Sequence, residues 1–190
     1  QARTRGWVTA LQLLRQTARL GAAAADLPED VFARTESDIF DYFSEEVFAA
    51  ETEPVRTFLL GSSVPDFIDP DICAEVLEGE DVGGVLDRLL QRKLFISPLE
   101  SQSEYYAYDP LFRDFLRRKL RTERGAEGRR ELDRRFGRAF ARRGAFPEAL
   151  AHWIAAEEVE PITELLQRHG HALLRGGMLD VVLEAAHFVS

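Results

Sequence analysis

Residues 86–120 read LDRLLQRKLFISPLESQSEYYAYDPLFRDFLRRKL. This stretch contains two helical patterns with a hairpin pattern between them. In its first part four leucines recur at helical spacing, at Leu86, Leu89, Leu90 and Leu94. Two β-forming pairs then flank a polar turn at 100–104, namely Phe95-Ile96 and Tyr105-Tyr106. Asp109 and Pro110 supply the cap and the first-turn residue of a second helix. The stretch therefore predicts a helix, a short hairpin and another helix.

Two helical segments also precede this stretch. Pro54 opens the first and Gly61 is placed to end it. Its apolar face is formed by Val55, Phe58 and Leu59. Asp69 and Pro70 repeat the start signal before a second segment at 72–77. Together with the helix, hairpin and helix that follow, these segments outline a winged helix, a fold that either reads DNA or docks against another domain of the same chain.

Nearer the N-terminus, two amphipathic helices are expected. Residues 7–20 place Trp7, Leu11 and Leu14 on one face. A second helix starts at 35–38, where Thr-Glu-Ser-Asp resembles a capping box. It carries three apolar side chains inward, from Ile39, Phe43 and Val47.

Composition describes a globular protein. The chain has 190 residues, of which 45% are apolar and 30% charged. No apolar run approaches the roughly 20 residues that a membrane span needs, and the start of the chain has no signal-peptide pattern. A single cysteine, Cys73, excludes an internal disulfide and is interpreted as a small core residue. We expect a cytoplasmic protein that has no contact with a membrane.

Charge is distributed unevenly around the net value of −9. Residues 27–110 contain twenty acidic and five basic side chains, and residues 111–145 contain thirteen basic and five acidic ones. A basic block of this density is typical of nucleic-acid binding. It also contains an apolar helical stripe, formed by Leu132, Phe136, Ala139 and Phe140. The arginines between these positions fall on other faces, at Arg130, Arg134, Arg135, Arg138 and Arg142. We therefore favour a solvated or intramolecular role, with the acidic segment as the internal partner.

After 125–128 the pattern changes to short paired helices, expected at 130–143, 147–156, 159–169 and 179–188. They are separated by Gly144, by Glu157-Glu158 and by Gly176-Gly177. Small residues at the crossings favour an α-solenoid of the tetratricopeptide kind. The predicted fold class is therefore mainly α: a winged helix with one small β-hairpin, followed by tetratricopeptide-like helical hairpins.

Motifs of catalysis are absent from the sequence. It contains no phosphate-binding P-loop, no nucleophile elbow and no zinc-protease or paired Cys-x-x-Cys motif. His169 and His171 point to different sides of a helix, so no metal site is expected there. His152 and His187 are interpreted as packing or solvent-edge residues. We expect neither an enzyme nor a metal site in this chain.

Several segments in order resemble the MalT-like regulators, which are signal-transduction ATPases (the STAND class) often grouped with LuxR-type transcription factors. The first is similar to the T-x-G-W-x-x-x-L-x-L helix that closes the nucleotide-binding region of this family, and begins Thr4-Arg5-Gly6-Trp7. The second is similar to the family's D-Y-L-x-E-E-V segment and reads Asp41-Tyr42-Phe43-x-Glu45-Glu46-Val47. The third resembles the end of their winged helix and reads Tyr108-Asp109-Pro110-Leu111-Phe112-Arg113-Asp114-Phe115-Leu116. The fourth matches their first helical repeat and reads Gly144-x-x-x-Glu148-Ala149-Leu150-x-His152.

The resemblance implies the central fragment of a larger transcriptional switch. It implies that residues 1–34 end a nucleotide-binding module, that 35–124 form the winged helix, and that 125–190 begin the tetratricopeptide-like sensor region. ATP or ADP would be held by the full-length protein, with no cofactor in this fragment. The implied partners are other domains of the same chain and an inducer or protein partner, with DNA bound through a domain outside the fragment. Regulation would act through docking and through an equilibrium that nucleotide and inducer bias in opposite directions.

One departure from the family lies at Asp109. Many members have a histidine just before the Leu-Phe-Arg stretch, near the nucleotide phosphate, and an aspartate there would repel phosphate. Either nucleotide sensing is altered at a nucleotide-proximal Asp109, or the nucleotide contact comes from another residue, or Asp109 is only a helix cap. The alternatives to the switch are a DNA-binding winged-helix repressor, with contacts from Arg88, Arg92 and Lys93 and the 111–145 block, and a helical-repeat adaptor that binds proteins.

Overall fold

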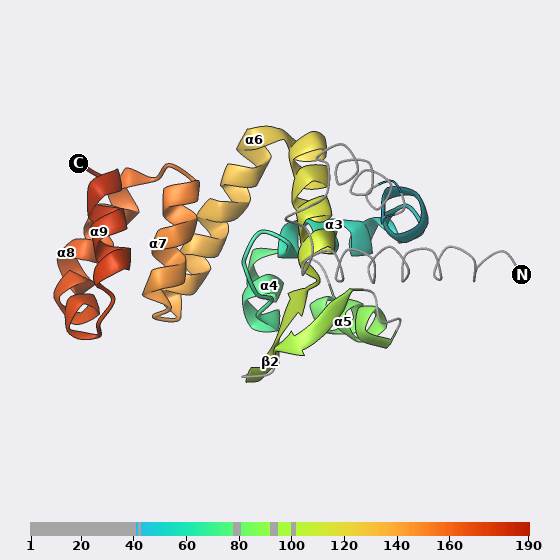
Figure 1. Cartoon of the computed structure of the whole chain (residues 1–190), viewed down its shortest axis with the longest axis horizontal. Coiled ribbons are helices and arrows are strands. Elements are labelled where there is room, and N and C mark those ends of the chain that lie inside the picture. Colours follow the sequence, from blue (N-terminus) through green and yellow to red (C-terminus); the bar gives the residue numbers. More distant parts are fainter. Residues whose placement is uncertain (1–40, 42, 78–80, 92–94, 100–101) are drawn as a thin grey trace, which may run out of the picture. The chain divides into compact units, whose positions relative to one another are not determined.

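The structure is a computed structural model that describes residues 41, 43–77, 81–91, 95–99 and 102–190. By its internal contacts the chain divides into two compact units, Gln1–Arg56 and Thr57–Ser190, and each is described by itself. The helices expected at 7–20 and at the 35–38 capping box lie outside the described residues. Within them the predicted fold class is confirmed, since the elements are helices and a single two-stranded antiparallel hairpin (Figure 1).

In the first unit, the described segment begins with the π-helix η2 (Phe43–Phe48). Phe43 and Val47 were predicted to point inward, and both side chains are buried. Helix α3 (Glu53–Ser62) begins one residue before the predicted Pro54 and extends into the second unit. Gly61 does not end this helix, which is a correction to the prediction. A Cβ at Gly61 would collide with the side chain of Leu77, so the glycine permits close packing instead.

In the second unit, the next two helices are α4 (Pro70–Val76) and α5 (Val82–Gln91). Asp69 caps α4 as predicted, because its Oδ1 accepts the backbone N–H groups of Asp71 and Ile72 at 2.9 and 3.1 Å. Helix α5 accounts for the leucine pattern up to Gln91, and Leu94 lies outside the described residues.

The hairpin consists of β1 (Ile96–Leu99) and β2 (Gln102–Tyr108), paired with Ile96 opposite Tyr108. Strand β2 already begins at Gln102, so the turn is shorter than the 100–104 segment that was predicted. On its other edge β2 forms a bridge to Ile68, in which Ile68 and Tyr106 exchange backbone hydrogen bonds of 2.7 and 3.0 Å. This one-residue contact completes the small sheet of the winged helix.

Helix α6 (Pro110–Arg142) is interrupted at Gly125, whose φ of 68° and ψ of −176° are not helical. That backbone region is accessible essentially to glycine alone. We call residues 110–124 the first limb and 126–142 the second limb, and Figure 1 shows them diverging from the bend. The sequence predicted a break at 125–128, and the structure places it at the first of these residues.

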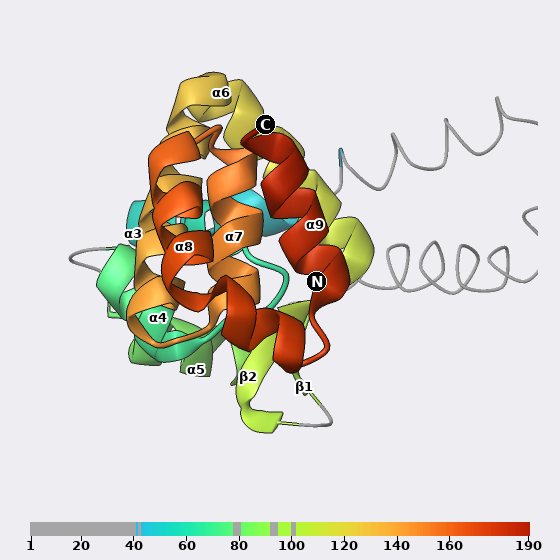
Figure 2. The same cartoon turned by 90° about the vertical axis from the view of Figure 1, so that its left-hand side faces the viewer.

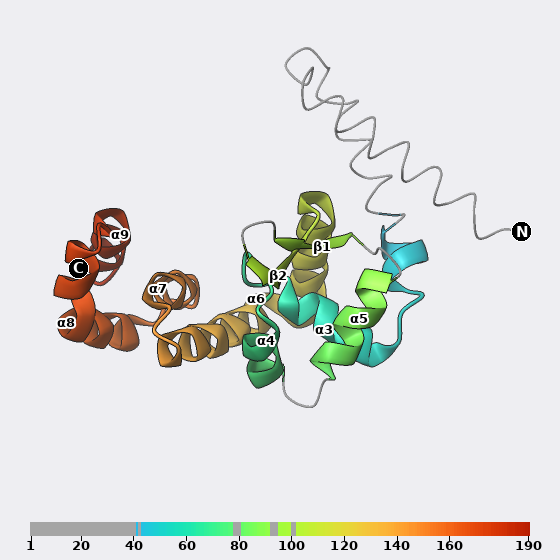
Figure 3. The same cartoon turned by 90° about the horizontal axis from the view of Figure 1, so that it is seen from below.

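Three helices follow the second limb in succession: α7 (Phe146–Ala155), α8 (Val159–Arg175) and α9 (Leu179–Phe188). Figures 2 and 3 show them side by side beyond that limb, while α4, α5 and the hairpin gather beside the first limb. The last helix has the predicted bounds. Helix α8 continues to Arg175 instead of ending at 169, because Gly170 is buried and keeps the helical conformation.

The turns before these three helices share one hydrogen-bond pattern. In each, a residue with positive φ follows the helix end, and the next N–H donates to a carbonyl five residues back. The three positive-φ residues are Gly144, Glu157 and Gly177. Glycine adopts this conformation without strain, whereas a positive φ is uncommon for a residue with a side chain such as Glu157.

The core of the second unit consists of aromatic and aliphatic side chains from every helix and from both strands. The predicted stripe is confirmed, since its four members are 4% exposed or less: Leu132, Phe136, Ala139 and Phe140. Full burial of such a Leu or Phe side chain contributes about 1.5–3 kcal/mol. Cys73 is buried as predicted, and its burial raises the pKa of the thiol.

Candidate functional site

The winged helix presents helix α5 and the hairpin as its potential contact surface. On α5 the exposed polar side chains include those of Asp87, Arg88 and Gln91. Arg88 is a DNA-contact candidate, and its Nε donates to the carbonyl of Gly84 at 3.1 Å. The other two candidates, Arg92 and Lys93, lie outside the described residues. The structure therefore places only one of the three, on a surface that also carries an aspartate.

Asp109 caps helix α6. Its Oδ1 accepts the backbone N–H groups of Leu111 and Phe112 at 3.0 and 3.5 Å, so the capping prediction is confirmed. The residue also borders a cavity of about 380 Å³ between the hairpin and the start of α6. The cavity lining comprises Phe95, Ile96, Ser97, Tyr108, Asp109 and Pro110. Whether Asp109 approaches a nucleotide stays a prediction.

Tyr108 fixes the base of the hairpin to helix α3. Its hydroxyl lies 2.7 Å from Ser62 Oγ, which itself donates to the carbonyl of Phe58 at 2.6 Å. Since the serine proton is used in that bond, the tyrosine hydroxyl donates to Ser62. Burial raises the pKa of Tyr108, and the hydrogen bond with Ser62 only partly offsets this shift. The hydroxyl is therefore held in its neutral form.

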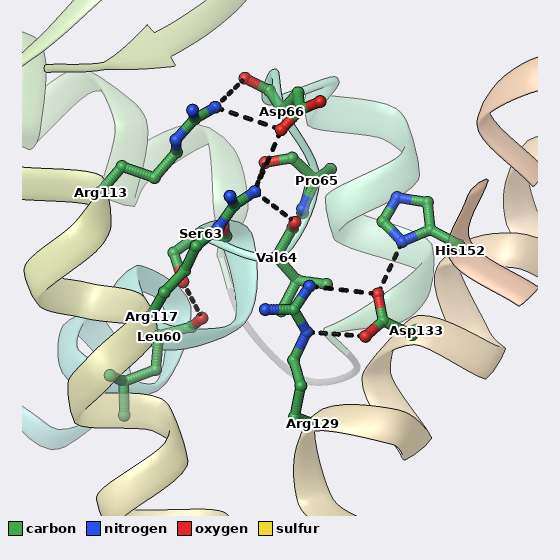
Figure 4. A network of polar contacts seen from close by, with 10 residues as sticks. All are labelled: Leu60, Ser63, Val64, Pro65, Asp66, Arg113, Arg117, Arg129, Asp133 and His152. Carbon is green, nitrogen blue, oxygen red and sulfur yellow. Dashed lines mark hydrogen bonds and ion pairs between the residues drawn. The ribbon is translucent and has the colours of Figure 1, made fainter. Parts of the chain in front are cut away.

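Two arginines of the first limb hold the loop that follows α3 (Figure 4). Arg117 donates from Nε to the carbonyl of Ser63 at 2.7 Å, and from Nη2 to the carbonyl of Val64 at 2.8 Å and to Asp66 Oδ1 at 3.1 Å. Burial lowers the pKa of Arg117, and the hydrogen bond to Asp66 opposes that shift. Arg113 donates to the carbonyl and to Oδ1 of Asp66, but its buried Nε has no partner.

On the other side of the Gly125 bend lies a buried carboxylate, that of Asp133. It is 1% exposed and accepts from Arg129 Nε at 2.6 Å, and His152 Nδ1 lies 2.8 Å from its other oxygen (Figure 4). The His152 ring stacks against Phe136 and Phe140, with centroids 5.5 and 5.4 Å away. The packing role predicted for His152 is thus confirmed, while its hydrogen-bond partner Asp133 was missed.

The second limb returns to contact the winged helix. Phe140 lies edge-on to Phe67 with 6.0 Å between ring centroids. Arg142 and Arg143 both form ion pairs with Glu75 on α4. These contacts hold α6 in its bent form, because they join its last turn to a helix that precedes the hairpin.

The intramolecular role predicted for the basic block is confirmed for several arginines. Arg130 pairs with Glu157 at 2.6 Å, and Arg134 pairs with Glu158 at 2.6 Å and with Glu127 at 2.8 Å. Their partners come from the 127–158 region rather than from the acidic 27–110 segment that we expected. That segment instead pairs with other arginines of the block: Arg113, Arg117, Arg142 and Arg143.

The residues that the structure describes contain neither a metal-binding cluster nor a helix suited to span a membrane. Within this part of the chain, no group of three His, Cys, Asp or Glu side chains is arranged to hold a metal ion. None of the described helices combines the length and the apolar character that crossing a membrane requires. The candidate site is therefore the set of contacts that joins the hairpin, the 63–66 loop and the two limbs of α6.

Comparison with known proteins agrees with this architecture. Residues 44–128 match the MalT winged helix domain. The HTH-type transcriptional regulator MalT of Vibrio cholerae is 31% identical over 182 residues, which cover 95% of this chain and 20% of that protein. MalT of Vibrio campbellii is 29% identical over 182 residues, with 95% and 20% covered, and MalT of Klebsiella pneumoniae is 28% identical over 178 residues, with 93% and 20% covered.

The chain spans about one fifth of the length of these relatives. Their similarity extends well beyond the matched winged helix, into helices α7 to α9, because it covers nearly the whole chain. The predicted resemblance to MalT-like regulators is thereby confirmed, since residues 44–128 match the MalT winged helix domain and the relatives cover nearly the whole chain.

Proposed function

We propose that this chain is the central regulatory part of an ATP-dependent transcriptional regulator, and that it acts by docking within its own chain. Its similarity to HTH-type transcriptional regulators supports the regulatory role. In this proposal residues 1–34 end a nucleotide-binding module, 35–124 form the winged helix and 125–190 begin a sensor arm for an inducer or protein partner. The chain has no enzymatic activity of its own, and ATP or ADP is held upstream.

The charge of the winged-helix surface is the observation that favours docking over DNA binding. Residues 78–104, which include α5 and the hairpin, contain six acidic and three basic side chains. Asp81, Asp87 and Glu104 are exposed among the described residues. A helix that enters a DNA groove must face two strands of phosphates, so an acidic surface there is repelled. This surface suits a protein partner better than DNA.

The basic block supports the same conclusion. Its arginines at the loop and at the bend donate to internal carbonyls and carboxylates, as Arg117, Arg129 and Arg134 do. Phosphate contacts would have to replace these bonds, and each charge-assisted hydrogen bond of the partly buried Arg117 and Arg129 contributes about 1.5–3 kcal/mol. These three arginines therefore stabilise the bent form of α6 and are poorly placed to bind the phosphates of DNA.

The cavity beside Asp109 is our candidate for the contact with the upstream module. Its half-buried Phe95 and exposed Pro110 offer apolar area for burial, while the Asp109 carboxylate is already engaged as a helix cap. A signal from the sensor arm would reach this cavity through the second limb, which touches Phe67 and Glu75 of the winged helix. Docking of this kind lets one interface favour the resting state until the sensor arm shifts the equilibrium away from that state.

Two measurements on the 190-residue chain test the proposal. Calorimetry with ADP and ATP should give no tight binding, because the chain has no phosphate cradle. Gel shifts with duplex DNA should show weak binding that disappears as salt rises. Micromolar nucleotide affinity would contradict the assignment of the nucleotide to the upstream module. A sequence-selective, sub-micromolar DNA complex would instead favour the repressor that uses Arg88, Arg92 and Lys93.

Docking itself is tested in the full-length regulator at Ser97, which is exposed and lines the cavity. Ser97→Glu adds a charge to the proposed interface, so we expect weaker retention of ADP and higher transcription without inducer. Ser97→Ala is the matched control and should behave as the wild type. If Ser97→Glu leaves both quantities unchanged, the cavity is not the docking surface.

A further inference from the structure

A second cavity, of about 340 Å³, lies between the second limb of α6 and helices α7 and α8. It shares no residue with the cavity beside Asp109. Its volume is at the lower end of the range for small-molecule sites. The side chains that matter for its chemistry are those of Arg138, Phe146, Trp153, Glu164, Arg168 and His169.

Aromatic rings form one part of the lining. His169 stacks on Phe146 with ring centroids 4.3 Å apart. The Trp153 indole packs closely on α6, where a Cβ at Gly137 would meet the ring at about 2.5 Å. Trp153 is only 7% exposed, so its ring is held in place by the helices around it. A flat apolar body can therefore meet the open edge of Trp153 and the stacked pair of Phe146 and His169.

The polar groups of the cavity are mainly donors. Arg168 is already neutralised by Glu164 one helical turn away. Among the described residues, Arg138 has no carboxylate or hydrogen-bond partner, and the indole N–H of Trp153 meets no acceptor. Arg138 presents five N–H donors in a planar fork that fits a carboxylate or a phosphate. The carboxylate of the lining, Glu164, is already paired with Arg168, so the donors of Arg138 remain available to a bound anion.

We infer that this cavity binds a small organic anion, with a carboxylate or phosphate group at Arg138 and a single flat ring against Trp153 and Phe146. The site adds to the docking function and does not depend on it, because the two cavities share no residue.

Fluorescence of Trp153 reports on this site directly. The chain has two tryptophans, so Trp7→Phe leaves Trp153 as the single emitter. Phenyl phosphate and benzoate serve as the anionic probes, with benzyl alcohol and inorganic phosphate as controls that keep only the ring or only the charge. We expect saturable quenching by at least one anionic probe at millimolar concentration, and at least about fivefold weaker binding of both controls.

Arg138→Gln should weaken binding of the anionic probe about fivefold, since one charge-assisted interaction is lost. Arg175→Gln is the matched control, because Arg175 is exposed at the end of α8 and does not line the cavity. Calorimetry on the same proteins provides a second readout. Equal binding of benzyl alcohol, unchanged binding by Arg138→Gln, or no binding by either method would each overturn the proposal.

Discussion

Replacement of Gly125 by alanine tests whether tertiary contacts hold α6 in its bent form. At φ 68° and ψ −176° a non-glycine residue is strained by about 1–3 kcal/mol. A Cβ there would meet no atom within 4 Å, so the substitution adds backbone strain without a steric clash. In a straight helix alanine would instead gain about 1 kcal/mol over glycine. Gly125→Ala therefore shifts the balance toward a straight helix by about 2–4 kcal/mol.

A straight α6 would lose the contact of Phe140 with Phe67 and the ion pairs at Glu75. We therefore expect the bend to persist under strain, with the free energy of unfolding lowered by about 1–3 kcal/mol in urea titrations followed by circular dichroism. Gly170→Ala is the matched control, because Gly170 is helical and its Cβ would also meet no atom within 4 Å. That variant should be as stable as the wild type or more so. Gly125→Ala with unchanged or raised stability would refute the reasoning.

Three further predictions concern the winged helix. Asp109→Ala should lower the free energy of unfolding by about 1 kcal/mol, and Asp109→Asn should lower it less because Asn caps nearly as well. Chemical denaturation measures both. Equal stability of the two variants and the wild type would contradict the cap. Burial raises the pKa of Tyr108 and Cys73, so the stability they contribute is complete below their ordinary values of 10.0 and 9.0 and falls as the pH rises above them. Urea midpoints measured from neutral to strongly alkaline pH should show this fall, and Cys73→Ala should make it less steep. Arg117→Met should lower the free energy of unfolding by about 2 kcal/mol in the same titration, and Arg113→Met should lower it less. Arg117 donates to two loop carbonyls at short distance, whereas Arg113 Nε has no partner among the described residues. Equal losses would argue against the role of Arg117 in holding the loop.

Local sequence signals were sufficient for most helix limits in the described residues. Asp69 and Asp109 cap the helices that follow them by bonds that reach only two or three residues along the chain. Gly144 and Gly177 end helices because positive φ costs a glycine little. The apolar periodicity likewise predicted the buried face of the second limb. Such signals act within one or two turns, so they can be recognised without the rest of the fold.

The candidate site was only partly predictable. Asp109 and the basic block were identified from the sequence, whereas the partners of that block were not. Arg117 and Asp66 are 51 residues apart, and Asp133 and His152 are 19 apart. The i, i+4 spacing of Arg129 and Asp133 was the one local signal for the buried carboxylate. The nucleotide role of Asp109 and the DNA contacts of Arg88, Arg92 and Lys93 stay predictions.

The sequence by itself determined the order of the elements, their breaks and the faces they bury, because these depend on backbone preferences and apolar spacing of nearby residues. Only the tertiary structure decided that Gly61 stays within α3 and that Ile68 pairs with β2. It also decided that the second limb of α6 returns to Glu75. Each of these contacts joins segments that are distant in the chain. Local periodicity does not indicate which distant surface a residue will contact.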